Sequence, residues 1–253
     1  MKPYKIHLLK YARREASSSQ VILGDLHNTP MEMSYYIWVA SNGEHTAVID
    51  MGFTEATASK RKREWLAQPA DLMRSIGVDP DSVRHAVVTH MHWDHVGNYA
   101  LFPNATYYVQ EDEMAFWTGR YVKYPVFNSA MDVEDICAMV RRNYAGRVEL
   151  TRGTQEIVPG IRVHKVSGHT KGIQIVEVAT ASGTAVVASD ATHTYRNLRE
   201  RRPHTVIHDI PNYLDGLELM LRLAKDESHI LPGHDPDAFH RHKRVSDLVA
   251  VLE

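Results

Sequence analysis

Cysteine is nearly absent from this chain of 253 residues, in which Cys137 stands alone. A single thiol excludes an intramolecular disulfide, and scarce cysteine is typical of a reducing compartment. The sequence also lacks any uninterrupted apolar run long enough to span a bilayer, and Met1 to Gln20 contain no apolar stretch of the kind found in signal peptides. We therefore expect an unprocessed cytoplasmic protein.

An excess of charge of one sign is missing as well. Lysine and arginine number 29 against 31 aspartate and glutamate residues, which makes a formal net charge of −2. This balance provides no general attraction to nucleic acid or to an anionic membrane, so we expect neither as a partner. With 43% hydrophobic and 24% charged residues, the composition is that of a globular chain, and we expect one domain over residues 1–253.

Histidine is the residue type that the sequence has in abundance, with 16 copies. It is the commonest metal ligand and transfers protons near neutral pH. The run His90-Met91-His92-Trp93-Asp94-His95 holds four potential ligands directly after His85–Thr89, which reads as a buried strand. Because side chains alternate along a strand, the four ligands converge only if the chain leaves the strand there and curls into a loop and a helix start.

Three further candidates also follow predicted strands. They are His169 after Ile161–Val166, Asp190 after Ala185–Ser189, and His234 after His229–Leu231. If these strand ends share one edge, the seven residues meet in one cleft, and a mixed set of imidazole and carboxylate ligands suits zinc, iron or manganese. Since structural zinc sites close with four ligands, seven candidates favour a functional centre over a purely structural metal.

The remaining patterns predict the fold. Further strands are expected at Tyr35–Ala40, Thr46–Asp50, Thr106–Gln110 and Ile173–Ala179. Helices are expected at Lys60–Ile76 with a break at Pro69, and at Glu111–Thr118, Met131–Arg142, Asn212–Lys225 and Asp237–Leu252. Strand clusters in each half, each followed by helices, predict an α+β protein in which two sheets pack face to face with helices outside, an αββα sandwich.

The H-x-H-x-D-H run, with the later histidine, aspartate and histidine at these intervals, is similar to the metallo-β-lactamase superfamily over nearly the whole chain. The resemblance implies two divalent metal ions, zinc first, with manganese or iron as alternatives. By this resemblance the first metal would be held by His90, His92 and His169, the second by Asp94, His95 and His234, and both by Asp190. Such a metal pair polarises a carbonyl group and supplies a bridging hydroxide at neutral pH.

Within the superfamily, the sequence resembles the N-acyl homoserine lactonases. The shared features are the total length, the segment Glu156-Ile-Val-Pro-Gly-Ile-Arg-Val, an aspartate at the place of Asp190, and Gly233-His234-Asp235. The resemblance implies a metal-dependent hydrolase that opens a lactone or related cyclic ester through the bridging hydroxide, with Asp94 and Asp190 in catalytic positions. It also implies a homodimer.

One position departs from the lactonase pattern. Those enzymes carry a tyrosine three residues after the bridging aspartate, where it contacts the substrate carbonyl oxygen, whereas this chain has His193. Tyr195, two residues further on, is one candidate to substitute for it. The other is His193 itself, which would donate a hydrogen bond or a proton to the oxyanion or the leaving group.

Apolar side chains are expected to complete a pocket for the substrate. The candidates are Met31, Met33, Phe116, Trp117, Tyr121, Tyr124 and Phe127. Methionine and aromatic side chains suit an apolar or aromatic substrate. The alternative is that the aromatic stretch packs a helix pair or a dimer interface. His204 and His208 are interpreted as loop residues without a partner.

Other functions stay open at the same site. One is a glyoxalase II-like thioesterase, although such an enzyme usually has an added C-terminal domain, for which 253 residues leave little room. Another is a β-lactamase, although that enzyme is commonly exported and Met1 to Gln20 contain no apolar stretch of a signal peptide. A mononuclear iron dioxygenase of this fold would usually lack one or more second-site ligands, yet Asp94, His95 and His234 are all present. A metal-dependent binding protein without turnover is the last alternative.

Overall fold

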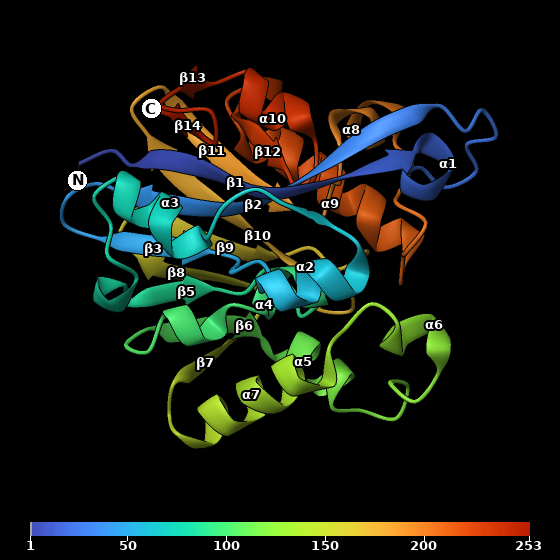
Figure 1. Cartoon of the computed structure of the whole chain (residues 1–253), viewed down its shortest axis with the longest axis horizontal. Helices are drawn as coiled ribbons and strands as arrows, with labels where there is room; N and C mark the ends of the chain where they lie inside the picture. The colour runs from blue at the N-terminus through green and yellow to red at the C-terminus, as the bar shows by residue number, and fades with distance from the viewer. Residues whose placement is uncertain (1) are drawn as a thin grey trace.

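Two β-sheets lie face to face in the computed structural model, which describes residues 2–253 (Figure 1). The nine-stranded sheet has the order β13 (Lys243–Arg244), β14 (Val249–Leu252), β1 (Lys5–Ser17), β2 (Pro30–Ser41), β3 (Thr46–Ile49), β5 (His85–Val87), β6 (Thr106–Gln110) and β7 (Val148–Thr151), with β4 (Glu64–Trp65) paired to β1. The five-stranded sheet has the order β12 (Ile230–Pro232), β11 (Gly183–Ser189), β10 (Gln174–Thr180), β9 (Ile161–Lys165) and β8 (Thr154–Val158).

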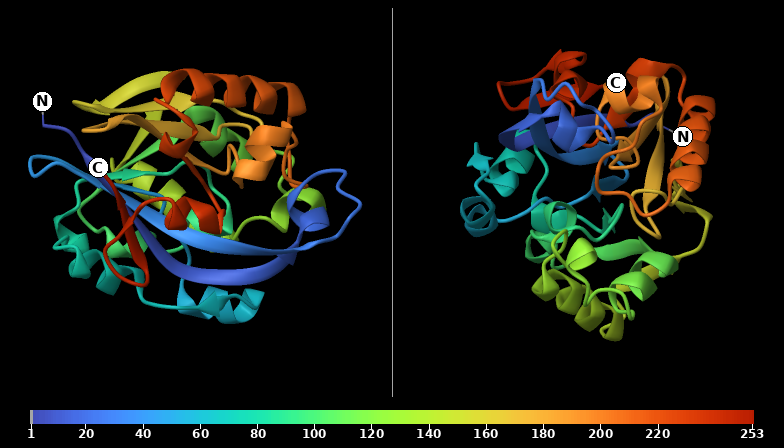
Figure 2. Two further views of the ribbon diagram at one scale, coloured as in Figure 1. Left: turned by 90° about the horizontal axis from the view of Figure 1, so that it is seen from above. Right: turned by 90° about the vertical axis from the view of Figure 1, so that its right-hand side faces the viewer.

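Helices cover the outer faces of both sheets. The helices of the chain are α1 (Ser18–Val21), α2 (Glu55–Arg61), α3 (Pro69–Ser75), α4 (Trp93–Val96), α5 (Glu111–Trp117), α6 (Pro125–Asn128), α7 (Val133–Tyr144), α8 (Tyr195–Glu200), α9 (Ile210–Leu223) and α10 (Pro236–His240). Short 3-10 helices occupy Pro80–Ser82, Tyr99–Leu101 and Glu227–His229. Seen from above, α9 lies on the smaller sheet, while α2 and α3 lie beyond the larger one (Figure 2). The predicted α+β sandwich is thereby confirmed.

Strand β2 shows why the sequence produces two apolar layers. Tyr36, Trp38 and Ala40 point into the core between the sheets. The alternate residues Tyr35, Ile37 and Val39 belong to the second core, beneath the helices of the larger sheet. Both faces of this strand are buried, so its sequence is a continuous apolar run instead of an alternating one.

The strand connections bring the candidate ligands to one edge. Strands β3, β5, β6 and β7 run parallel to one another in the larger sheet, and β11 runs parallel to β12 in the smaller one. Residues that follow parallel strands leave the sheet on the same side, which is where open α/β sheets place their ligands. Among residues 2–253, no helix combines the length and the apolar character needed to cross a membrane.

Two predicted helices differ from the structure. The segment Asp237–Leu252, expected as a closing helix, forms α10, β13 and β14 instead. Val249–Leu252 is buried throughout and pairs antiparallel with Ile6–Leu9 of β1, because a run that is apolar on every side fits a two-faced strand better than an amphipathic helix. Within Lys60–Ile76, the helix before Pro69 ends at Arg61 and the short β4 follows it.

Candidate metal centre

The six-residue run from His90 to His95 changes conformation as it enters the site. Strand β5 ends at Val87, His90 and His92 lie in the loop that follows, and α4 begins at Trp93. Asp94 and His95 therefore leave from a helical turn, whereas His90 and His92 leave from the loop before it. This bend lets four nearby residues face one cleft, as the sequence predicted.

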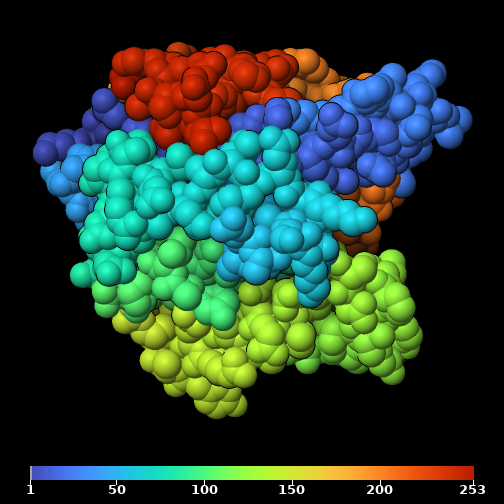
Figure 3. All heavy atoms as spheres, in the orientation of Figure 1, coloured from blue at the N-terminus to red at the C-terminus, as the bar shows by residue number. Residues whose placement is uncertain are grey.

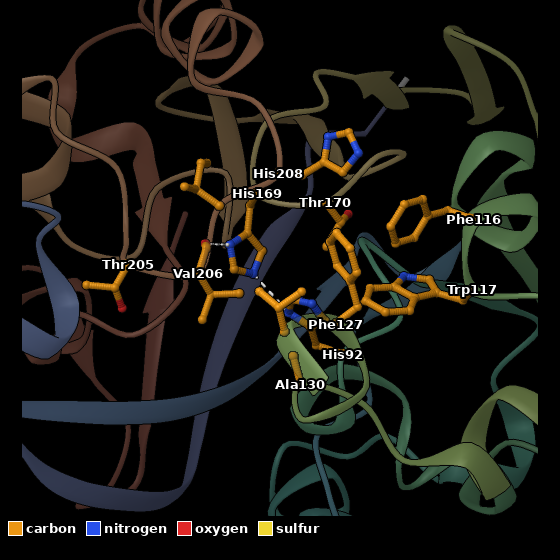
Figure 4. Close-up of a pocket in the computed structure, with 12 residues that line it drawn as sticks. His92, Phe116, Trp117, Phe127, Ala130, His169, Thr170, Thr205, Val206 and His208 are labelled. Carbon is orange, nitrogen blue, oxygen red and sulfur yellow. Dashed lines mark hydrogen bonds between the residues drawn. The ribbon is translucent and has the colours of Figure 1, made fainter. Parts of the chain in front are cut away.

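One group of ligand atoms is formed by His90, His92, His169 and Asp190, whose candidate atoms lie within 4.8 Å of one another. The Nδ1 atom of His92 lies 3.1 Å from Nε2 of His90 and 3.0 Å from Nε2 of His169. His92 and His169 point toward each other at the rim of the cleft (Figure 4). Three ring nitrogens thus converge on one small space.

A second group contains Asp94, His95 and His234, again with candidate atoms within 4.8 Å of one another. The Nε2 atoms of His95 and His234 each lie 3.7 Å from an oxygen of Asp94. Asp94 is half-buried and the two histidines are buried. The structure thus brings the second set of predicted ligands together as well.

Asp190 lies between the two groups and turns one oxygen toward each. Its Oδ2 atom is 3.4 Å from Nε2 of His169 and 3.8 Å from Nε2 of His90. Its Oδ1 atom is 3.0 Å from Nε2 of His234 and 3.5 Å from Nε2 of His95. A Cβ atom on Gly233 would come within 2.3 Å of Oδ1, so only glycine leaves room for the carboxylate in this position.

Four of the histidines contact a neighbouring group through Nδ1, on the side of the ring away from the cleft, and these outer partners fix the orientation of the ring. The contacts are His90 to the Thr89 hydroxyl (3.1 Å), His95 to Asp50 (2.7 Å), His169 to the Val206 carbonyl (2.8 Å) and His234 to the Ser34 carbonyl (3.0 Å). An Nδ1–H that donates to such an acceptor leaves the lone pair on Nε2, which is the atom that faces the cleft. His92 has the opposite orientation and presents Nδ1.

Burial and charge divide the histidines into two sets. Burial lowers the pKa of His90 and His169 well below the ordinary value, and lowers that of His92 to about 4. These rings are neutral at pH 7, as metal ligands must be. Burial also acts on His95 and His234, but the carboxylates that face them, Asp190 first, outweigh it and raise both pKa values. Metal binding to this second group would release protons.

The residues present fit a pair of divalent metal ions. Nε2 of His95 and Oδ1 of Asp190 are buried, and none of their contacts within residues 2–253 has the geometry of a hydrogen bond. Unpaired buried polar atoms are costly, and an ion between them would remove that cost. Imidazole nitrogens with carboxylate oxygens are the donor set of zinc, and also suit iron and manganese.

His193 lies beside the shared carboxylate. Its Nε2 atom is 3.0 Å from Oδ2 of Asp190, and its ring stacks on His204 at 3.9 Å with an interplanar angle of 5°. His204, interpreted from the sequence as a loop residue without a partner, is therefore part of the site. Burial lowers the pKa of His193, so this ring is also neutral at pH 7.

Tyr195 does not reach the cleft. Its hydroxyl donates to the carbonyl oxygen of Ile230 at 2.9 Å in the core between the sheets, and Arg241 covers its ring at 3.9 Å. This corrects the prediction that Tyr195 substitutes for a tyrosine that contacts the substrate. Tyr195 is the first residue of α8, and its side chain turns away from the ligand groups to fill the core.

Two buried carboxylates that the sequence reasoning missed support the ligand loops. Asp50, at the end of β3, accepts hydrogen bonds from the Thr89 N–H and the hydroxyls of Thr89 and Ser189, besides that from His95. Glu113, in α5, accepts hydrogen bonds from the loops of His92 and His169. The sequence does contain a feature that points to Asp50, since this residue directly follows the buried strand β3, as the predicted ligands follow theirs. Glu113 gave no comparable signal.

The cleft has two lobes that meet at His92 and His169. The lobe containing most of the ligands has a volume of about 200 Å³ and is also lined by Met33, Tyr35, Trp93 and His204. The other, of about 120 Å³, is largely apolar and lined by Phe116, Trp117, Phe127 and His208, and Figure 4 shows these rings beside the two histidines. Figure 3 shows a recess between the projecting segments near residues 20–35 and 120–130.

Only some of the residues predicted to form the pocket line the cleft. Met33, Phe116, Trp117 and Phe127 line the cleft, whereas Met31 packs beside α1. Tyr121 and Tyr124 are about half exposed, at 45% and 49%. Tyr121 stacks on the Phe116 ring at 6.1 Å, so it supports the apolar lobe from outside.

Comparisons with known proteins agree with the fold. The family model described as the metallo-beta-lactamase superfamily matches residues 30–244. An N-acyl homoserine lactonase of Bacillus thuringiensis is 27% identical over 169 residues, which cover 65% of this chain and 61% of that protein. The N-acyl homoserine lactonase AiiB of Agrobacterium fabrum is 30% identical over 175 residues, which cover 66% and 62%. The chain thus spans less than two thirds of the length of these curated relatives.

A solved structure extends the likeness to nearly the whole fold. The crystal structure of a quorum-quenching N-acyl homoserine lactone lactonase superposes with a TM-score of 0.80, covering 97% of this chain and 98% of that chain, at 20% identity. At this identity the likeness concerns the architecture alone.

Proposed function

Because the chain belongs to the metallo-beta-lactamase superfamily, we propose that it is a hydrolase dependent on two divalent metal ions, and that it opens a lactone or a related cyclic ester. The observation that carries the proposal is the position of Asp190, with one carboxylate oxygen toward each of two ligand groups. The names of the matched relatives, N-acyl homoserine lactonases, support a cyclic ester as the substrate class.

His90, His92 and His169 would hold the first ion, and Asp94, His95 and His234 the second, with Asp190 shared between them. Zinc is the proposed metal because imidazole predominates in both groups. When bound, the pair would polarise the ester carbonyl and lower the pKa of water so that hydroxide is available near neutral pH. The buried partners of the histidines hold the rings in the orientation that this requires.

The residues around the ligand groups divide the remaining work. His193 places an N–H beside Asp190, where it can donate to the oxyanion or to the leaving oxygen. Its stack on His204 keeps the ring in place. The aromatic lobe excludes water from one side and accepts an apolar part of the substrate.

A hydrolysis screen tests the proposal. The zinc- or manganese-loaded protein is compared in a pH-stat on acyl homoserine lactones, aromatic and aliphatic lactones, a thioester and a β-lactam. Asp190→Asn should bind fewer than two metals and lose at least about a hundredfold in rate, because loss of a ligand costs more than loss of an outer partner. Asp215→Asn, which removes the same charge at a site on α9 away from the cleft, is the control. Two bound metals with no lactone opened would overturn the lactonase assignment.

A further inference from the structure

Two arginine side chains line the lobe that contains the ligand groups. Arg14 comes from β1 and Arg63 from the segment just before β4, and both border the same space as Asp94, Asp190 and His234. Both guanidinium groups also act on one hydroxyl, since each of them opposes the rise in the pKa of Tyr35 that its burial causes. Two cations of the protein therefore border the same space as the candidate reaction centre.

Arg14 has no carboxylate partner within residues 2–253. Its Nε atom is buried and makes no hydrogen bond there, and its Nη2 atom contacts only the sulfur of Met33, at 2.9 Å. A thioether is a weak acceptor. By contrast, the neighbouring Arg13 binds Glu64 at 2.9 Å and Glu32 at 3.3 Å. The Nη1 atom of Arg14 makes no hydrogen bond within residues 2–253 either, so the guanidinium group keeps N–H donors for a carboxylate ligand.

Arg63 is held in position without being neutralised. Its Nε–H donates to the hydroxyl of Tyr35 at 2.7 Å, and its Nη1 donates to the carbonyl oxygen of Arg61 at 2.5 Å. The guanidinium group lies 5.4 Å from the centre of the Trp93 ring. Its Nη2 makes no hydrogen bond, and no carboxylate lies within ion-pair distance, across the part of the chain that the structure describes. The side chain is thus oriented with an N–H donor to spare.

The metal centre itself does not require these two positive charges or consume them. Two divalent ions bring four positive charges, which three carboxylates, Asp50, Asp94 and Asp190, and one hydroxide would balance. The guanidinium groups then leave the lobe with a net positive charge. A low-dielectric cleft with such a charge attracts an anion, and an uncharged lactone would leave both groups without an acceptor.

We propose that Arg14 and Arg63 form a carboxylate-binding subsite, and that the substrate is a lactone carrying a carboxylate group. This rests on the proposed function for the lactone, while the carboxylate follows from the two arginines. The carboxylate lies against the guanidinium groups, and the ring ester lies at the two ligand groups. Any apolar portion extends past His92 and His169 into the aromatic lobe.

Kinetics on a matched pair of substrates test the subsite. The metal-loaded protein is assayed on γ-butyrolactone-γ-carboxylate and on the corresponding carboxamide, which has the same ring without the charge. We expect the acid to be preferred at least about tenfold in kcat/KM. Arg14→Gln and Arg63→Gln should each lower the value for the acid about ten- to hundredfold more than the value for the amide. Arg14→Lys should restore only part, because it cannot bind bidentately.

Arg13→Gln is the matched control, since it removes a neighbouring charge that is already paired with two glutamates. Equal rates for acid and amide in the wild-type protein, with no effect of either arginine variant, would overturn the subsite and leave the lactonase proposal standing. Thermal melts of each variant check that it is folded. Because the two arginines are replaced separately, the second variant still tests the subsite if the first does not fold.

A binding measurement separates the subsite from catalysis. The zinc-loaded protein is titrated calorimetrically with 2-hydroxyglutarate, the ring-opened product of the acid, and with its uncharged diamide. We expect binding of the diacid alone, weakened about tenfold or more by Arg14→Gln and by added salt at about 0.5 M. Arginine-dependent binding in a protein that opens no lactone would support the subsite and defeat the proposed function. Equal binding to the Arg14→Gln and wild-type proteins would overturn the subsite.

Discussion

The Nδ1 atom of His95 lies 2.7 Å from Oδ2 of Asp50, and this contact joins the ligand-bearing turn of α4 to the end of β3. Asp50 is fully buried and has a left-handed backbone with φ of 55°, a conformation that aspartate tolerates better than most residues. Its carboxylate accepts four hydrogen bonds from three segments of the chain. Asp50 therefore positions His95 without facing the cleft.

Replacing Asp50 should weaken metal binding at the second group. In Asp50→Ala, the Nδ1–H of His95 loses its acceptor at 2.7 Å and keeps only the more distant Ser189 hydroxyl at 3.3 Å, so the ring is held less firmly in its orientation and tautomer. Loss of such an outer partner costs about ten- to a hundredfold in metal affinity. Competition with a chromogenic chelator measures the two affinities separately, and the affinity of the group around His90 should change less. Asp71→Asn on the exposed surface of α3 is the control; unchanged affinities in Asp50→Ala would contradict this role.

His193 should affect turnover more than metal content. His193→Gln keeps a side chain of similar length but removes the imidazole N–H beside Asp190. Because that N–H would stabilise charge that develops during the reaction, we expect kcat to fall about a hundredfold with KM and metal stoichiometry nearly unchanged. His240→Gln, at the exposed end of α10, is the control. A His193→Gln protein with wild-type kcat would show that the ring only packs.

Glu113 should contribute to stability through the loops that it connects. It accepts hydrogen bonds from the Met91 and Gly172 N–H groups, the Trp117 indole and the Thr170 hydroxyl, at 2.6 to 2.9 Å. In Glu113→Gln, the new amide donor faces existing donors, so the free energy of unfolding should fall by about 2–4 kcal/mol. Urea denaturation of the chelator-treated proteins measures this. Glu111→Gln, a neighbour that pairs with Arg152 at the surface, should change stability by under about 1 kcal/mol.

Asp135 should make the stability of the protein depend on pH. Burial, helped by repulsion from Asp132, raises its pKa from the ordinary value of 3.8 to about 7 in the folded chain. The folded state therefore retains a proton that the unfolded state has released, so the contribution of this group to stability is complete below about pH 4 and is lost as the pH rises through about 7.

The test is Asp135→Asn, which cannot ionise. Its melting temperature relative to the wild type should rise between about pH 4.5 and pH 8, by roughly 6–12 °C, because a pKa that folding moves from 3.8 to about 7 changes stability by ~3 kcal/mol over this range and ~1 kcal/mol shifts the melting temperature of a chain of this size by about 2–4 °C. Comparing the two proteins at each pH cancels contributions from other groups. A difference that stays constant over this pH range would show that the carboxyl group titrates normally. Asp71→Asn again serves as the exposed control.

Local sequence determined much of the candidate metal centre. The run from His90 to His95, together with His169, Asp190 and His234, could be selected because each candidate follows an apolar segment that forms a buried strand. Strand ends are local features of a sequence, and parallel neighbours bring such ends to one edge. The sandwich followed from the order of strands and helices for the same reason.

Tertiary packing decided what local patterns do not contain. Val249–Leu252 became a strand because β1 offers an unpaired edge, and Tyr195 turned inward because Ile230 offers a carbonyl oxygen in the core. The stack of His193 on His204 and the unpaired state of Arg14 within residues 2–253 also depend on the tertiary structure. A side chain's partner is set by three-dimensional proximity, so the sequence determined which residues could bind metal, and the fold decided which of the others face the substrate.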